Sequence, residues 1–277
     1  MMSKISVIGA GFVGSTGTYA LMLKEVADEI ALIDINESLV ASEVADINQG
    51  FKGLSKTRIK IGTYADCQDS DLIVITAGLG RKVGESRLDL LNKNIKIMES
   101  IAEQINKTHT KAFILVVSNP VDVLTYKLSK MITAPVKGVY GSGCALDTSR
   151  LISVLADKFN EPVDNIEGYV IGEHGDSQIV DWDSVKICGL SVEDYCKAKN
   201  IAFNEDDKQQ IAETVKKYGM TIISGKGRTN YGIGTSICVI SEAILKNKGV
   251  VLSVALPDDS VETAVSKPRL VDAKGVH

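Results

Sequence analysis

One histidine in a glycine-rich turn is the residue of this sequence best suited to acid–base chemistry. The chain has three histidines, and His174 is the one set in Gly172-Glu173-His174-Gly175-Asp176, directly after an apolar segment. Glycine on both sides suits a ring that must face a ligand closely. His109 lies in a polar turn and His277 is the last residue, so both are expected on the solvated surface. Because imidazole exchanges a proton near neutral pH, His174 is the first candidate for catalysis.

A second motif predicts a dinucleotide site at the start of the chain. Gly9-Ala10-Gly11-Phe12-Val13-Gly14 follows the apolar residues 5–8, precedes a helical pattern and is followed at the usual spacing by Asp34. The glycines allow a tight turn, a close approach to a pyrophosphate at the helix N-terminus, and packing of helix on strand. The Asp34 carboxylate would accept hydrogen bonds from the adenosine ribose and repel a 2′-phosphate, which favours NAD over NADP. A glycine-rich turn without a ligand is the alternative.

Short apolar runs alternate with amphipathic segments through the first half of the chain. Apolar strands separated by helices indicate a parallel sheet that is covered on both faces. Strands are expected at residues 5–8, 30–33, 58–61, 72–77, 113–117 and 136–140, and helices at 12–24, 37–48, 88–107 and from Pro120 onward. The predicted fold class is therefore α/β, with a doubly wound parallel Rossmann sheet.

The pattern changes near Gly143. A helix is expected at residues 147–159, strands at 166–171 and 178–187, a helical stretch at about 205–246 that is interrupted near Gly225 and Gly227, and short β segments after it. We expect an NAD-binding Rossmann domain over residues 1–143 and an α+β substrate domain over residues 144–277. No low-complexity linker separates them, so they should pack tightly.

The composition is that of a globular protein with a mildly acidic charge balance. Of 277 residues 44% are hydrophobic and 24% are charged, and the formal net charge is −4. These values give no reason to expect a nucleic-acid partner. No apolar run approaches the roughly 18 residues of a membrane span, and no basic leader or cleavage site is seen, so no membrane partner is expected. Five cysteines without a C-x-x-C pair indicate a reducing, cytoplasmic location and no metal site.

The motifs together resemble those of the L-lactate/malate dehydrogenase family. The glycine motif, Asp34 and the His174 turn are joined by Gly84-Glu85-Ser86-Arg87-Leu88-Asp89-Leu90, Ser118-Asn119-Pro120-Val121-Asp122 and Leu146-Asp147-Thr148-Ser149-Arg150. Gly141-Ser142-Gly143 and Lys226-Gly227-Arg228-Thr229-Asn230-Tyr231-Gly232 look like the lactate branch. The resemblance runs to about Lys246. It implies an NAD-dependent oxidoreductase of small 2-oxo and 2-hydroxy acids, active in glycolysis and fermentation as a homodimer or homotetramer.

The resemblance also implies a role for each side chain of the site. His174 would give a proton to the substrate carbonyl oxygen, and Asp147 would hold the other ring N–H and raise the imidazole pKa. Arg150 would bind the substrate carboxylate through its planar guanidinium, and Arg87 would polarise the carbonyl. Three alternatives stay open: Asp147 could only cap its helix, Arg150 could pair with an acid of its own helix, and Arg87 could be a surface residue.

Further positions carry over from the same resemblance. Asn119 resembles the residue that contacts the nicotinamide ribose and the active site, and Thr229 would line the pocket near the substrate side chain. The polar loop at residues 78–88 would close over the substrate, exclude water and bring in Arg87.

Arg81, in this loop, bears on the choice of substrate. Lactate-type enzymes usually have glutamine there, whereas malate-type enzymes have an arginine that pairs with the second carboxylate of oxaloacetate. Residues 84–87, the Gly-Ser-Gly segment and Thr229 are of lactate type. A solvated Arg81 reconciles the two observations, because its long stem can carry the charge to water. We expect pyruvate and L-lactate, with oxaloacetate and L-malate, or a broader 2-hydroxy acid range, as the alternative.

The C-terminal region departs from the family pattern. Members continue past the position of Gly275-Val276-His277 with a further strand and a long helix, and residues 246–268 look shortened. Loss of that helix would expose apolar surface and loosen the pocket. An NAD-binding protein without turnover is therefore a second alternative.

The sequence predicts no activation by fructose 1,6-bisphosphate. Family members that respond to it carry an arginine and a histidine at positions where this chain has Ile152 and Glu167. An aliphatic side chain and a carboxylate hold a phosphate poorly. Adding the bisphosphate to a steady-state assay should leave the KM for the 2-oxo acid unchanged. A large drop in that KM would contradict this expectation.

Overall fold

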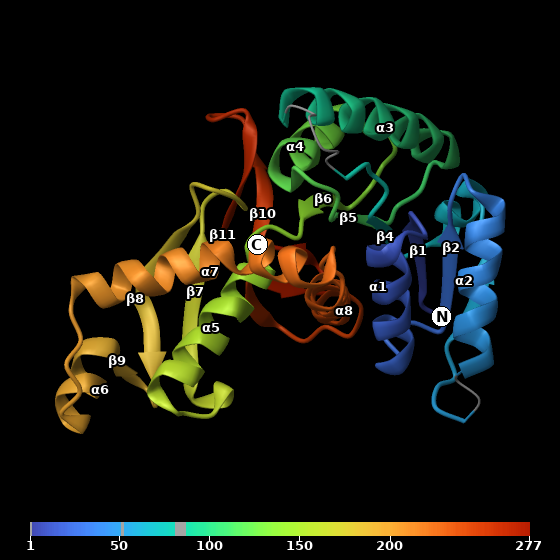
Figure 1. Ribbon diagram of the computed structural model, residues 1–277. Coiled ribbons are helices and arrows are strands. Elements are labelled where there is room, and N and C mark those ends of the chain that lie inside the picture. The colour runs from blue at the N-terminus through green and yellow to red at the C-terminus, as the bar shows by residue number, and fades with distance from the viewer. Residues whose placement is uncertain (1, 51–52, 81–86) are drawn as a thin grey trace.

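A nine-stranded sheet organises the protein, whose computed structural model describes residues 2–50, 53–80 and 87–277 (Figure 1). The strand order is β12-β11-β10-β6-β5-β4-β1-β2-β3. Six neighbouring strands are parallel: β1 (Lys4–Ile8), β2 (Glu29–Ile33), β3 (Arg58–Ile61), β4 (Leu72–Ile75), β5 (Phe113–Val116) and β6 (Gly138–Gly141). Their order is doubly wound and reverses between β1 and β4, where sheets of this kind bind ligands at the carboxyl ends of the strands. The predicted fold class is confirmed.

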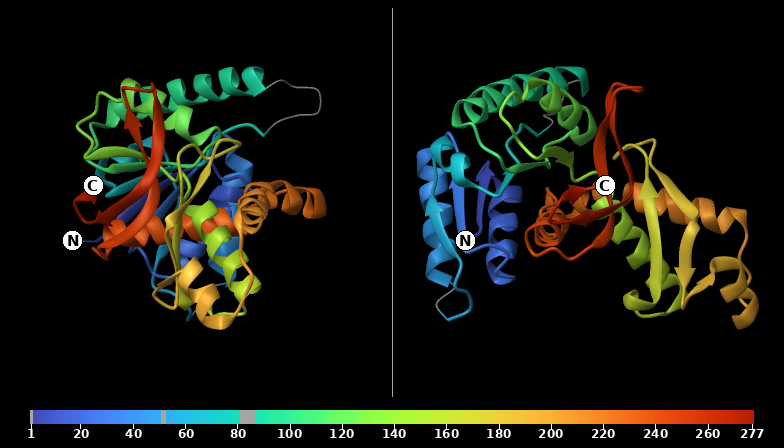
Figure 2. Two further views of the ribbon diagram at one scale, coloured as in Figure 1. Left: turned by 90° about the vertical axis from the view of Figure 1, so that its left-hand side faces the viewer. Right: turned by 180° about the vertical axis from the view of Figure 1, so that it is seen from behind.

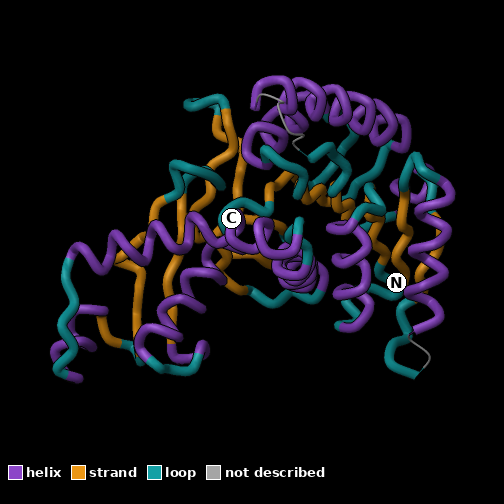
Figure 3. The backbone as a smooth tube through the Cα atoms, in the orientation of Figure 1, coloured by secondary structure: helices purple, strands orange, loops and turns teal. Residues whose placement is uncertain are grey.

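Helices cover both faces of this sheet, as its continuous apolar strands require. The core of one face contains residues of α1 (Phe12–Leu23), α2 (Glu37–Gly50) and α8 (Tyr231–Leu245), and that of the other contains residues of α3 (Arg87–Thr108) and α4 (Val121–Met131). Leu72 and Val74 of β4 belong to the first core, and Ile73 and Ile75 to the second. Figure 3 shows the helices on either side of the strands. Because successive side chains of a strand point to opposite faces of the sheet, one strand can contribute apolar side chains to both cores.

The second half of the chain builds a smaller layer. α5 (Ala145–Phe159) packs on an antiparallel sheet of β7 (Ile166–Ile171), β8 (Ile179–Ile187) and β9 (Leu190–Ser191), followed by α6 (Val192–Lys199) and α7 (Glu205–Lys226). Short 3-10 helices lie at Tyr64–Asp69 and Val163–Asn165. Among the described residues, no helix combines the length and the apolar character needed to cross a membrane.

The chain then returns to the main sheet. The hairpin of β10 (Val250–Asp258) and β11 (Thr263–Asp272) pairs with β6 through Ala255 and Gly141, and β12 (Gly275–Val276) follows on β11. In the right-hand view of Figure 2 this hairpin, in red, stands between the strands of the first half and β7 and β8. Gly172 and Ser266 exchange two backbone hydrogen bonds of 2.9 Å. The hairpin therefore links the two sheets.

The structure corrects several details of the predicted elements. Pro120 was expected inside the first turn of a helix, but it lies just before α4. The C-terminal strands are long rather than short: β10 and β11 pair along their whole length and continue through Pro257 and Pro268. The sequence also did not predict α6, a short polar helix whose cap is the hydroxyl of Ser191. The boundary near residue 143 stays a prediction.

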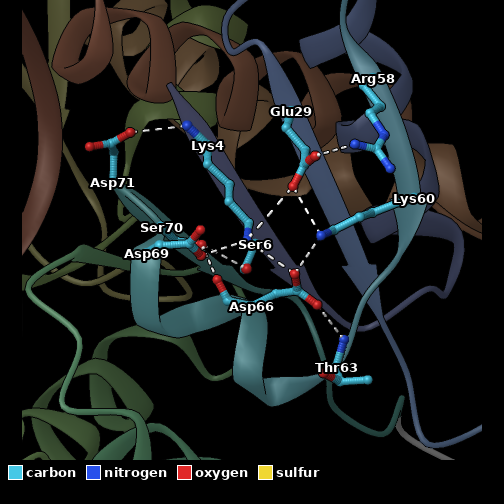
Figure 4. Close-up of polar contacts among 10 residues, drawn as sticks. All are labelled: Lys4, Ser6, Glu29, Arg58, Lys60, Thr63, Asp66, Asp69, Ser70 and Asp71. Carbon is cyan, nitrogen blue, oxygen red and sulfur yellow. Dashed lines mark hydrogen bonds and ion pairs between the residues drawn. The ribbon is translucent and has the colours of Figure 1, made fainter. Parts of the chain in front are cut away.

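A charge network joins the amino ends of β1 and β2 to neighbouring elements (Figure 4). Lys4 Nζ lies 3.0 Å from Asp66 and 2.5 Å from Asp69, and Lys60 Nζ lies 2.7 Å from Asp66 and 3.0 Å from Glu29. Burial raises the pKa of Asp66, but hydrogen bonds from Lys60, the Thr63 backbone and Lys4 outweigh this and lower it to about 2. The network therefore favours the ionised form of Asp66.

Removing the Asp66 charge should destabilise the protein. In Asp66→Asn the buried Lys4 and the partly buried Lys60 lose a charged partner, and the unfolding free energy at pH 7 should fall by about 1–3 kcal/mol. Because the folded pKa is depressed below 3.8, this contribution is complete above about pH 5 and fades as pH falls towards 2. Urea unfolding at several pH values measures both effects.

Glu103→Gln is the matched control, because that carboxylate pairs with Lys107 on an exposed helix surface. Its urea curve should superimpose on that of the wild type. If the difference in unfolding free energy between wild type and Asp66→Asn grew as the pH fell, the result would contradict the expectation.

Candidate active site

The predicted glycine motif forms the turn between β1 and α1. Gly9 has a φ of +109°, and a Cβ at this position would lie 2.6 Å from the backbone nitrogen of Ala77. A Cβ on Gly14 would overlap the carbonyl oxygen of Gly9. Only glycine therefore lets α1 start this close to β1 and to the end of β4.

The residues around this turn suit a dinucleotide. A Cβ on Gly11 would meet no heavy atom within 4 Å, and α1 begins at Phe12 with the unpaired N–H groups of its first turn. Asp34 Oδ2 accepts the Ala10 N–H at 2.7 Å, and Oδ1 accepts the Asn36 N–H at 2.9 Å. Each oxygen keeps a second lone pair, so Asp34 can brace the turn and also accept a ribose hydroxyl.

One buried carboxylate holds the candidate catalytic residues together. Asp147 lies in the first turn of α5 and is 1% exposed. Its Oδ2 lies 2.5 Å from His174 Nδ1, and its Oδ1 accepts a hydrogen bond of 2.8 Å from Arg150 Nη1. Asp147 and Arg150 are three residues apart on one helix face, and His174 comes from the turn after β7.

The charges of this group shift the two pKa values in opposite directions. Burial raises the pKa of Asp147, but the hydrogen bond and charge of His174, with Arg150, bring it below its usual value. Burial lowers the pKa of His174, but the hydrogen bond and charge of Asp147 raise it above 6.5 overall. The pair therefore stabilises the imidazolium form of His174 relative to a free imidazole.

A cavity of about 450 Å³ connects this group to the glycine turn. It brings together six of the residues predicted for the site: Val13, Asn119, Asp147, Arg150, His174 and Thr229. Their side chains come from both halves of the chain and from five different segments. A substrate in this cavity can therefore reach a proton donor, a guanidinium and the start of the dinucleotide site together.

The structure bears on two of the three alternatives left by the sequence. Asp147 is not the N-cap of α5, because Cys144 occupies that position. Arg150 does pair with an acid of its own helix, and that acid is Asp147. Arg81 lies outside the described residues. Arg87 begins α3, but its side chain lies outside them, so its role stays a prediction.

Two buried polar residues were not predicted to take part. Asn94 of α3 is fully buried; its Nδ2 donates to the Asn119 carbonyl at 2.8 Å, and its Oδ1 accepts the Leu79 N–H at 2.8 Å. Asp122 of α4 is 3% exposed and accepts the backbone N–H of His174 at 2.6 Å. Asn94 is a polar residue on an otherwise apolar helix face, and this pattern in the sequence could have indicated a buried hydrogen-bonding role. No group of His, Cys, Asp and Glu in the described chain is arranged to hold a metal ion.

Family models match both halves of the chain. Residues 3–141 match the lactate/malate dehydrogenase NAD binding domain, and residues 144–276 match the lactate/malate dehydrogenase alpha/beta C-terminal domain. The chain belongs to the lactate/malate dehydrogenase family. Its first half is thus the NAD-binding part of a dehydrogenase, and its cofactor is NAD.

Named relatives of the dehydrogenase agree with this assignment. It is 45% identical over 253 residues to an L-lactate dehydrogenase of Clostridium perfringens and 42% identical to one of Clostridium botulinum; each alignment covers 91% of this chain and 80% of the relative. A lactate dehydrogenase from a Medee basin deep-sea metagenome library has a TM-score of 0.94 at 34% identity, covering 100% of this chain and 90% of that one. The minor L-lactate dehydrogenase of Enterococcus mundtii, with ligands bound, has a TM-score of 0.93 at 34% identity, with coverage of 100% and 89%.

The Asp147–His174 contact predicts the titration of the dehydrogenase's central imidazole. Asp147→Asn removes the charge and one acceptor, so the His174 pKa should fall by about 1–3 units. Imidazole NMR titration measures this directly. Asp157→Asn changes an exposed acid of the same helix and should leave the His174 midpoint in place. An unshifted midpoint in Asp147→Asn would show that this contact does not control the imidazole.

Proposed function

We propose that the protein is an NAD-dependent L-lactate dehydrogenase that interconverts pyruvate and L-lactate. The observation that carries the proposal is the sharing of Asp147 between His174 and Arg150 in one cavity with the glycine turn. A 2-oxo acid has a carboxylate next to a carbonyl, and this arrangement offers one cation to each. The names of the similar bacterial enzymes support the same substrate.

Arg150 is proposed to bind the substrate carboxylate. Its side chain is 12% exposed, and one N–H is fixed by Asp147, which orients the guanidinium plane. The remaining N–H groups can pair with a carboxylate in the bidentate geometry that a point charge cannot reproduce. Gly219 of α7 lies beside Nη2, where even a Cβ would come within 3.5 Å. The absence of a side chain there leaves room at this end of the cavity.

His174 is proposed to move the proton. With Nδ1 held by Asp147, Nε2 is the nitrogen that can give its proton to the carbonyl oxygen during reduction and take it back during oxidation. When bound, the nicotinamide supplies the hydride. Reduction needs the imidazolium, so pyruvate reduction should fall as pH rises through the raised His174 pKa, and lactate oxidation should rise over the same range. Arg87 is proposed to stabilise the negative charge on the oxygen.

The alternative substrate is oxaloacetate. Arg81 is of malate type, and Lys216 of α7 also lines the cavity, so a second carboxylate would meet positive charge. Thr229, which is of lactate type, lines the same cavity. We favour pyruvate because the named relatives are L-lactate dehydrogenases.

The proposal includes a cytoplasmic enzyme that forms a homodimer or homotetramer. Its five cysteines are free thiols, as in a reducing compartment. α1 and α8 pack together and leave several large apolar side chains exposed on their outer surfaces: Phe12, Tyr19, Leu23, Tyr231 and Val239. Exposed apolar residues on adjacent helices are typical of a surface that another subunit covers.

Substrate preference can be tested by NADH oxidation with pyruvate and with oxaloacetate. The wild type should prefer pyruvate by kcat/KM, and Arg81→Gln should raise the ratio of pyruvate to oxaloacetate about tenfold or more by removing a cation. Lys82→Gln removes the neighbouring charge and should leave the ratio unchanged. If oxaloacetate is preferred by the wild type and Arg81→Gln reverses the order, the protein is a malate dehydrogenase. NADH binding without turnover of either acid would favour a binding protein.

A further inference from the structure

A second buried carboxylate reaches the catalytic turn from the first half of the chain. Asp122 is the second residue of α4, close to Asn119, which lines the cavity. The side chain of Asp122 is almost completely buried, and Oδ2 accepts the backbone N–H of His174 at 2.6 Å. This hydrogen bond joins residues 52 positions apart and ties the main chain of the catalytic turn to the helix that follows β5.

The hydrogen bond does not by itself explain why this residue is an acid. Any neutral acceptor of the same shape, such as asparagine, could accept the His174 N–H. Asp122 Oδ1 is buried and has no hydrogen-bond partner among the described residues, which makes a carboxylate costly at this position. Burial raises the pKa of Asp122 to about 6, while the N–H and the charge of His174 lower it. The charge therefore needs a reason other than packing.

We propose that Asp122 is a positioning residue for proton transfer, which clamps the main chain of His174 and places a second negative charge beside its imidazole. This inference rests on the proposed function of His174 as the proton donor. Asp147 fixes the ring through Nδ1, whereas Asp122 fixes the backbone that carries the ring. The two acids act on His174 from different helices, α5 and α4.

Other charged groups surround the imidazole, and most are less able to influence it than Asp122. Facing it are Asp147 and Arg150 from α5, Asp122 from α4, Glu173 and Asp176 from its own turn, and Lys216 from α7 on the wall of the cavity. Asp122 adds to the positive shift of the His174 pKa, whereas Arg150 opposes it. Glu173 is exposed and pairs with the Ser177 hydroxyl, so water screens its charge. Asp122 is buried, so its charge is screened much less.

Two substitutions separate the charge from the clamp. Asp122→Asn keeps an acceptor and removes the charge, so the imidazole midpoint of His174 should fall by about 0.5–1 pH unit while the limiting kcat changes little. Asp122→Glu keeps the charge and displaces the acceptor, so the midpoint should stay near the wild-type value while kcat falls about tenfold or more. Glu173→Gln, the matched control, should change neither quantity.

Imidazole NMR titration of the full chain without substrate and steady-state pH profiles give the two readouts. The upper limb of pyruvate reduction and the lower limb of lactate oxidation should both move to lower pH in Asp122→Asn. A wild-type midpoint in folded Asp122→Asn, or a lowered midpoint in Asp122→Glu, would overturn the proposal. If Asp122→Asn does not fold, Asp122→Glu decides alone. Because the titration needs no substrate, absence of turnover in the wild type would count against the proposed function without changing this result.

Discussion

The site depends on one buried carboxylate that two cationic side chains share. Asp147 is almost without solvent contact, and its two oxygens are divided between His174 and Arg150. A charge buried this deeply is tolerated only when it is paired and hydrogen-bonded. The same two contacts therefore satisfy the carboxylate, select the ring nitrogen that is free to act, and orient the guanidinium. The start of α5 adds its helix dipole, which favours a negative group in the first turn.

The main sheet and its C-terminal hairpin bring the partners of Asp147 to it. α5 follows β6 almost directly, so Asp147 stands at the carboxyl ends of the parallel strands, where the glycine turn also lies. The turn that carries His174 belongs to the smaller sheet, and the bridge between Gly172 and Ser266 fixes its start against β11. Asp122 holds the same turn from α4. The positions of Asp147 and His174, the proposed catalytic pair, are thus set by contacts from three separate parts of the chain.

Local sequence patterns predicted much of this arrangement. Contacts between residues distant in sequence could not be predicted in the same way. The parallel strands, the glycine turn, and the helix that carries Asp147 and Arg150 follow from short-range periodicity and motif spacing. The pairing of Arg150 with Asp147 is only one alternative at the sequence level, because a guanidinium three residues from an acid on a helix can also bind other groups. The sequence did not predict the contacts of Asp122 and Asn94. Each side chain forms a hydrogen bond with a backbone group that only the tertiary fold places next to it. Pro268 lies inside the long strand β11, where β12 pairs only with Val271 and Asp272, so this strand tolerates a missing N–H.

The return of the C-terminal hairpin to β6 has a consequence for the order in which the protein can form. The backbone N–H of Cys144, at the start of α5, donates to the hydroxyl of Ser266, 122 positions later in the chain. Parallel strands of the first half can pair while the second half is still being synthesised, but the edge at β6 stays open until the hairpin has emerged from the ribosome. Contacts of such long range close late and slow folding. During translation the nascent chain therefore carries an unpaired sheet edge at β6, whose free backbone N–H and C=O groups favour aggregation.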